Sequence, residues 1–121
     1  MLRVRSLTFL AIGVLGLGCN LTGPCENAQA IDISSPDGGL AAWVFVRDCG
    51  ATTAKSVHVS ILPTSDDPPR DAGNTFIIEQ ESTVIAEWPA PGQLLISYEP
   101  LGEVFKKESS VAGVVVSYRA Q

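Results

Sequence analysis

The feature that most constrains the fold is a series of short apolar runs separated by turn-forming residues. Runs rich in Val, Ile, Leu and aromatic side chains alternate with clusters of Pro, Gly, Asp and Ser from residue 35 to the C-terminus. No segment there repeats its apolar residues at the period of about 3.6 residues that marks an amphipathic helix. The pattern therefore predicts an all-β, single small domain of about six or seven mostly antiparallel strands, folded as a sandwich or a partly open barrel.

Two runs in the first half of this region carry clear strand signals. Residues 40–47 follow the Pro-Asp-Gly-Gly turn at 36–39 and are largely apolar on both faces, which predicts a central strand. Residues 56–62 alternate strictly, with three aliphatic side chains on one face, which predicts a half-buried strand. The same alternation predicts that His58 lies on the polar, solvent-facing side.

The second half predicts a hairpin and a closing strand. Residues 83–88 and 93–98 alternate on either side of the turn-forming sequence Pro-Ala-Pro-Gly, which is typical of an antiparallel hairpin. Residues 100–108 fit either a short helix or an irregular edge. Residues 111–118 are rich in β-branched side chains and predict a last strand, in which Gly113 marks a bulge or a point of close contact.

The segment 63–74, before a short predicted strand at 76–78, is expected to form a loop. It contains three prolines and three aspartates, Asp66, Asp67 and Asp71. Carboxylate oxygens are calcium ligands, but these aspartates lack the spacing of an EF-hand loop. A solvated loop is the simpler interpretation, and we predict no metal site and no cofactor.

The N-terminus has the features of an export signal. Two arginines precede the uncharged apolar stretch 7–17, which has the length of a signal-peptide core and is short for a transmembrane helix. We predict a signal peptide over 1–18, a tether over 19–30 and a β-rich domain over 31–121.

Two cleavage sites compete. The sequence Leu-Gly-Leu-Gly-Cys resembles a bacterial lipobox, which would make Cys19 the lipidated first residue, although Leu17 stands where a small residue is usual. The sequence at 28–30, Ala-Gln-Ala, fits ordinary signal peptidase instead. Cleavage there would release a soluble secreted or periplasmic protein.

The cysteine count bears on this choice. If Cys19 is lipidated, Cys25 and Cys49 remain as an even pair in an oxidising compartment. If cleavage follows Ala30, Cys49 is left alone. The count therefore favours a lipoprotein of the cell envelope, anchored in the membrane by acyl chains on Cys19. A disulfide between Cys25 and Cys49 would stabilise so small a domain by about 3 kcal/mol.

The charge limits the class of partner. Removal of the two signal-peptide arginines leaves six cations against thirteen acids, a net charge of −7. An acidic surface of this kind argues against nucleic acid as a partner. A protein partner of unknown identity is the remaining expectation.

A Cys–His pair is the one candidate for catalysis. Cys49 precedes the chain's single histidine, His58, by nine residues, and a nucleophile would need a reduced thiolate beside that base. No third orienting group or oxyanion hole is recognisable, and export favours the disulfide. We therefore predict no catalytic residue and a protein that is not an enzyme.

Four aromatic residues are candidates for a glycan-binding groove. They are Trp43, Trp88, Tyr98 and Tyr118, and three of the four lie among apolar strand residues. Packing in the core is therefore the expected role of these rings.

Several motifs together indicate a family. The sequence has an SPDG turn, a V-S-I-L strand, a G-N-x-F step, a tryptophan before L-x-I-S-Y, and an R-D-C-G-A-T-T block. It resembles a family of short exported bacterial proteins of unknown function, many of which look like lipoproteins. The resemblance implies that Cys25 is retained and pairs with Cys49. The family motif of unknown role comprises Arg47, Asp48, Cys49, Gly50, Thr52 and Thr53.

These observations predict a function class without a specific activity. We expect an exported envelope protein, lipid-anchored, that acts as a non-catalytic binding or structural module. An inhibitor or immunity-type protein directed at an envelope or secreted enzyme is one alternative. A glycan-binding accessory domain is another.

Overall fold

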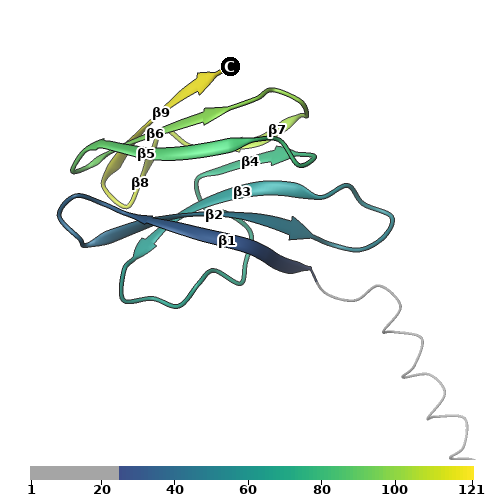
Figure 1. Cartoon of the computed structure of the whole chain (residues 1–121), viewed down its shortest axis with the longest axis horizontal. Coiled ribbons are helices and arrows are strands. Elements are labelled where there is room, and N and C mark those ends of the chain that lie inside the picture. The colour runs from purple at the N-terminus through teal and green to yellow at the C-terminus, as the bar shows by residue number, and fades with distance from the viewer. Residues whose placement is uncertain (1–24) are drawn as a thin grey trace, which may run out of the picture.

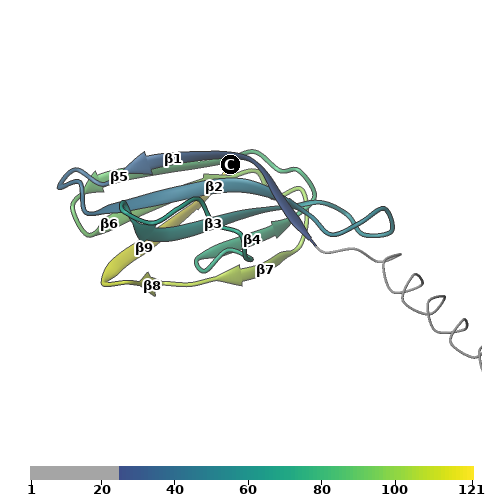
Figure 2. The ribbon, with the colours of Figure 1, turned by 90° about the horizontal axis from the view of Figure 1, so that it is seen from below.

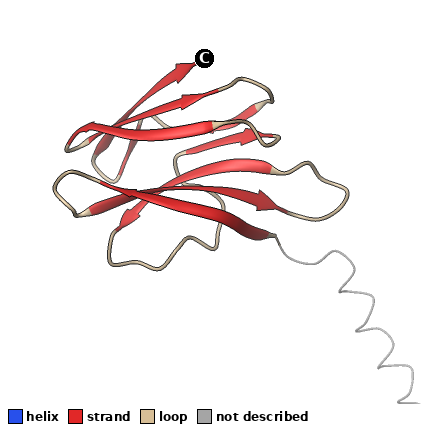
Figure 3. Ribbon diagram, in the orientation of Figure 1, coloured by secondary structure: helices blue, strands red, loops and turns tan. Residues whose placement is uncertain are grey.

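The computed structural model describes residues 25–121, which form nine strands and no helix (Figures 1 and 3). The predicted signal peptide at 1–18 and the predicted lipidation site Cys19 lie outside the described residues. Within 25–121, no helix has the length and hydrophobicity needed to span a membrane. The strands are β1 (Glu26–Ser34), β2 (Leu40–Asp48), β3 (Ser56–Pro63), β4 (Phe76–Glu79), β5 (Val84–Ala90), β6 (Gln93–Tyr98), β7 (Val104–Lys107), β8 (Ser110–Val111) and β9 (Val114–Ala120).

The strands form two sheets packed face to face, so the predicted all-β fold is confirmed and the structure is a sandwich. Sheet A has the order β1-β2-β3-β4-β7, and sheet B has the order β5-β6-β9-β8. Neighbouring strands are antiparallel except for β6 and β9, which run parallel. Figure 2 shows β1 and β5 side by side at one edge of the sandwich.

Several predicted strands are confirmed. The run after the 36–39 turn is β2, which lies between β1 and β3 as a central strand should. The predicted hairpin is the antiparallel pair β5–β6, in which Val84 lies opposite Tyr98. The ambiguous segment 100–108 contains the short strand β7, which pairs with β4 at the edge of sheet A.

The start of the domain differs from the prediction. The tether was expected to extend to residue 30, but β1 begins at Glu26 and pairs with β2 from the Glu26–Asp48 position onward. Apolar and polar residues alternate only from Ile31 to Ser34, the pairing register shifts between Ala28 and Ile31, and seven of the nine residues are exposed. Backbone pairing at a sheet edge needs no apolar face, so the pattern did not mark this strand.

The core lies between the two sheets. Its buried side chains come from six strands, β2, β3 and β4 of sheet A and β5, β6 and β9 of sheet B. Phe76 is fully buried and lies 4.9 Å from Tyr98 and 5.4 Å from Tyr118, between ring centroids. The aromatic prediction is confirmed for Trp88, Tyr98 and Tyr118, which lie in or against this core.

The C-terminal strand is interrupted by a turn. The predicted strand 111–118 is a tight hairpin in which Val111 lies opposite Val114. Ala112 and Gly113 connect the two strands with φ angles of 52° and 79°, the combination that a two-residue type I′ turn requires. The interpretation of Gly113 as a bulge or close contact is therefore wrong, since a Cβ there would meet nothing within 4 Å.

Candidate functional site

A disulfide closes one end of sheet A. Cys25 and Cys49 are bonded, with an S–S distance of 2.04 Å; they lie next to the Glu26–Asp48 pair, immediately before β1 and immediately after β2. The predicted bridge is thus present. Disulfides persist in oxidising compartments, so this bond indicates a non-cytoplasmic location.

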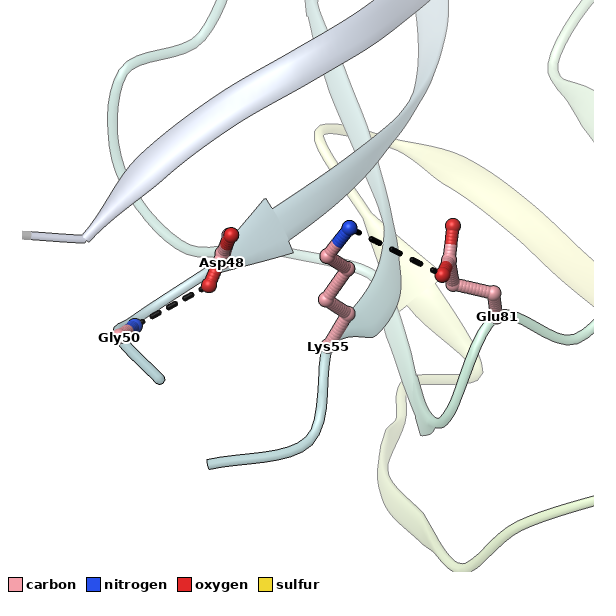
Figure 4. A network of polar contacts seen from close by, with 4 residues as sticks. All are labelled: Asp48, Gly50, Lys55 and Glu81. Atoms are coloured by element: carbon pink, nitrogen blue, oxygen red, sulfur yellow. Dashed lines mark hydrogen bonds and ion pairs between the residues drawn. The ribbon is translucent and has the colours of Figure 1, made fainter. Parts of the chain in front are cut away.

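The rest of the Arg-Asp-Cys-Gly-Ala-Thr-Thr motif forms the corner after this bond (Figure 4). The Asp48 carboxylate accepts a hydrogen bond of 3.1 Å from the Gly50 N–H, and the Thr53 hydroxyl donates one of 3.2 Å to the Gly50 carbonyl. Gly50 has a φ of 122°, which an L-residue rarely adopts. Within residues 25–121, the Thr52 side chain makes no comparable hydrogen bond.

An ion pair connects this corner to the loop between β4 and β5. Lys55 Nζ lies 4.0 Å from Glu81 Oε1, and about half of each side chain is exposed (Figure 4). A pair this exposed contributes about 1 kcal/mol or less to stability. The corner is therefore held chiefly by the disulfide and its turn hydrogen bonds.

Arg47, the first residue of the motif, fixes a distant loop. Its guanidinium donates a hydrogen bond of 2.7 Å to Asn27 Oδ1 and one of 3.1 Å to the Arg70 carbonyl. The Asn27 amide in turn donates to the carbonyls of Pro69 and Asp71, at 2.9 and 3.0 Å. These residues hold the β3–β4 loop (residues 64–75) against the face of sheet A that points away from sheet B (Figure 1).

The far end of this loop is attached to β3 by further hydrogen bonds. Asn74 donates from its side chain to the Ile61 carbonyl and accepts from the Ile61 N–H, both at 2.9 Å. The Asn74 N–H donates to the Ser60 hydroxyl at 3.1 Å. A segment that the composition marks as a solvated loop is therefore fixed to the sheet along much of its length.

His58 lies beneath this loop and is 4% exposed. The prediction that it faces solvent is therefore wrong. Alternation placed it correctly on the outer face of sheet A, opposite Phe45 on β2, whose ring centroid is 5.4 Å from that of His58. The β3–β4 loop covers that face, and the Gly73 N–H donates a hydrogen bond of 2.8 Å to His58 Nδ1.

The hydrogen bonds define the tautomer of His58. A backbone N–H can only donate, so Nδ1 accepts and carries no proton. The proton of the neutral ring is therefore on Nε2, which donates to Ser56 Oγ at 2.7 Å. Burial, with added repulsion from the positive charges of Arg47 and Lys106, lowers the pKa of His58 to about 4, so the ring is neutral at pH 7.

Ser56 and His58 form a close pair that the sequence interpretation missed, although their spacing on one strand face was a visible signal. A histidine that activates serine must accept the hydroxyl proton at Nε2. Here Nε2 already carries a proton, which is the reverse of that arrangement. The Cys49–His58 hypothesis fails as well, because Cys49 is bonded to Cys25 and both ring nitrogens of His58 have other partners.

Two open pockets flank the β3–β4 loop. The larger, about 490 Å³, lies beside the disulfide and is lined by Cys25, Glu26, Asn27, Ala28, Asp48, Pro69 and Arg70. The smaller, about 240 Å³, is lined by Ser60, Leu62, Pro69, Arg70, Asp71, Ala72 and Asn74. Pro69 and Arg70 line both pockets, so the loop separates them.

Of the other candidate residues, Asp71 lines the smaller pocket, whereas Asp66, Asp67, Trp43 and Trp88 line neither pocket. Asp66, Asp67 and Asp71 are exposed on the loop, and within residues 25–121 no three His, Cys, Asp or Glu side chains are grouped as metal ligands would be. Trp88 donates from Nε1 to the Ile33 carbonyl at 2.9 Å, and Trp43 is half-buried on the outer face of sheet A. These two rings do not form an exposed platform.

The chain was compared with protein-family models, with curated proteins and with solved structures, and none of the three comparisons gave a match. The resemblance carried by the Arg47–Thr53 motif therefore stays a prediction.

Proposed function

We propose that this protein is an exported, non-catalytic binding module of the bacterial cell envelope. In this proposal acyl chains on Cys19 anchor it in the membrane, and the surface formed by the β3–β4 loop and the larger pocket binds a protein partner. The observation that carries the proposal is the fixing of this loop by Arg47 and Asn27, with an open polar pocket beside it. Binding surfaces are commonly loops positioned by a rigid scaffold.

The chemistry of the site supports binding over catalysis. Cys49 has no free thiol, and His58 donates toward the neighbouring serine hydroxyl instead of accepting its proton. The pocket carries charges of both signs, with Glu26 and Asp48 against Arg70. Mixed charge in a shallow polar pocket suits a protein surface better than an apolar small molecule.

The disulfide supports export, and the anchor is tested separately. Intact mass of the mature protein extracted from membranes would show acyl chains on a chain that starts at Cys19 and contains one disulfide. A Cys19→Ala variant should leave the membrane fraction. A mature chain that starts at Ile31 would contradict both the anchor and the Cys25–Cys49 pair.

The binding surface is tested by site-specific crosslinking. A photoreactive amino acid at Arg70, in the wall of both pockets, should capture a discrete protein in the native envelope. The same group at Ser117, an exposed position on sheet B, is the matched control. The captured protein should then bind purified wild type more tightly than Arg70→Glu; equal binding would contradict the proposed surface. Capture of an envelope hydrolase that this protein inhibits would identify the inhibitor or immunity-type alternative.

A further inference from the structure

His58 has no part in the proposed binding surface, yet it holds that surface in place. It contacts Gly73 near the end of the β3–β4 loop, and this contact is tight. A Cβ on Gly73 would lie 2.8 Å from the Val59 carbonyl oxygen and 2.9 Å from His58 Cβ. The carbonyl of Gly73 also accepts a hydrogen bond of 3.0 Å from Lys106 Nζ. The Gly73 peptide is thus held from both sides.

The hydrogen bond between His58 and Gly73 exists only while the imidazole is neutral. Protonation would place a hydrogen on Nδ1, where the Gly73 N–H already donates at 2.8 Å. Two donors would then face each other, and each would lack an acceptor. The other ring nitrogen already donates to Ser56, so it offers the added proton no alternative site.

The charged groups around His58 do not compensate a positive ring. Arg47 on β2 and Lys106 on β7 are the ions that act on it, and both are cations. Glu79 on β4 lies opposite Ser56, two residue pairs from the His58–Ile77 pair, and the loop carries Asp71 two residues before Gly73. Neither carboxylate is a hydrogen-bond partner of the ring, whose two nitrogens bond to Ser56 and Gly73.

We propose that the His58–Gly73 hydrogen bond is a proton-operated latch, which holds the Gly73 end of the β3–β4 loop against β3 at neutral pH and releases it in acid. The loop's other side-chain hydrogen bonds come from Asn27, Arg47, Thr64, Asn74 and Lys106 and do not involve the imidazole, so the loop stays attached while the Gly73 N–H is released from β3. This regulation of binding rests on the proposed function, because the loop forms the proposed surface. The latch itself is tested on the protein alone.

The test is hydrogen exchange and ¹⁵N NMR of the full mature protein between pH 7 and pH 4. At neutral pH the ring nitrogens should show the tautomer protonated at Nε2. Below pH 6.5, the ordinary pKa of histidine, each further fall of one pH unit should raise the ratio of open to closed loop about tenfold. The increase ends when His58 of the closed form binds the proton as well. The opening of the Gly73 amide, corrected for intrinsic exchange, should therefore rise roughly 100-fold over two pH units, while amides in β2 and β6 keep their protection.

Two variants separate the latch from general acid effects. His58→Gln retains an acceptor for Gly73 and cannot be protonated in this range, so the acid-induced opening should disappear. Gly73→Ala should be open already at pH 7. The matched control is Asp66→Asn/Asp67→Asn/Asp71→Asn, which removes the carboxylates of the loop. Its Gly73 amide should open in acid as that of the wild type does.

Three results would overturn the latch. The first is a Gly73 amide that stays protected while the imidazole titrates. The second is an opening that persists in His58→Gln, and the third is one that vanishes in the triple aspartate variant. None of these results depends on a partner, so they can be distinguished from failure of the crosslinking at Arg70. If the latch holds, the captured partner should dissociate faster in acid from wild type than from His58→Gln.

Discussion

Removal of the Cys25–Cys49 disulfide should detach β1 from the domain. β1 is the edge strand of sheet A, and seven of its nine residues are exposed, so it buries little apolar surface. Besides its pairing with β2, two residues attach it to the rest of the fold. The Asn27 side chain bonds to the β3–β4 loop, and Ile33 packs its side chain against the core while its backbone carbonyl accepts from Trp88 Nε1. The covalent bond at its first residues is therefore a large part of what retains it.

The magnitude follows from the length of the loop that the bond closes. The two cysteines are 24 residues apart in sequence. In the chain-entropy model, closing a loop of that length destabilises the unfolded state by about 3.5 kcal/mol. For a domain of this size, that is a substantial fraction of the total free energy of unfolding.

The assay compares urea unfolding of three forms: oxidised wild type, wild type treated with a reductant, and Cys25→Ser/Cys49→Ser. Fluorescence of Trp43 and Trp88 reports the transition. We expect both disulfide-free forms to lose about 3.5 kcal/mol, with a steeper dependence on urea because the unfolded chain is less compact. Agreement between the reduced protein and the double variant controls for effects of the serines themselves.

Hydrogen exchange locates the effect. Amides of β1 should lose protection in both disulfide-free forms before those of β2 and β3. A loss of stability below about 1 kcal/mol, or β1 amides as protected as those of β2, would refute the reasoning, because the entropic term alone exceeds that value.

Other substitutions test the core, the sheet edge and the turns. Phe76→Ala should cost about 3–5 kcal/mol in urea unfolding, since the fully buried ring contacts both tyrosines of the core. Trp88→Phe should cost about 1 kcal/mol by removing the hydrogen bond to Ile33, again measured by urea unfolding. Ala112→Asn should raise stability by up to about 1 kcal/mol, because asparagine tolerates the positive φ of this turn. The pKa of Asp37, lowered from 3.8 by the Ser35 hydroxyl and the Gly39 N–H, should rise in Ser35→Ala, as measured by carboxyl ¹³C NMR against pH.

The sequence by itself determined the fold class, most of the inner strands and the cysteine pairing. Apolar runs and alternation with a period of two are local properties. The run after the 36–39 turn marked β2, and alternation marked β3 and the β5–β6 hairpin, without knowledge of their partners. The cysteine count and the family resemblance together indicated the bond between Cys25 and Cys49, which the structure contains.

The tertiary structure alone decided which elements meet. The first residues of β1 carry no strand pattern, and they join the sheet through backbone pairing with β2. β7 joins sheet A although it follows a strand of sheet B. The parallel contact between β6 and β9 follows from that crossing, and no local pattern encodes it.

The candidate site shows the same division. Alternation placed His58 on the outer face of its strand, and that part was right. Whether that face meets water depends on a loop attached by Arg47 and Asn27, residues distant from it in sequence. Periodicity reports the face on which a side chain lies, whereas its burial, and so its pKa, depends on what covers that face.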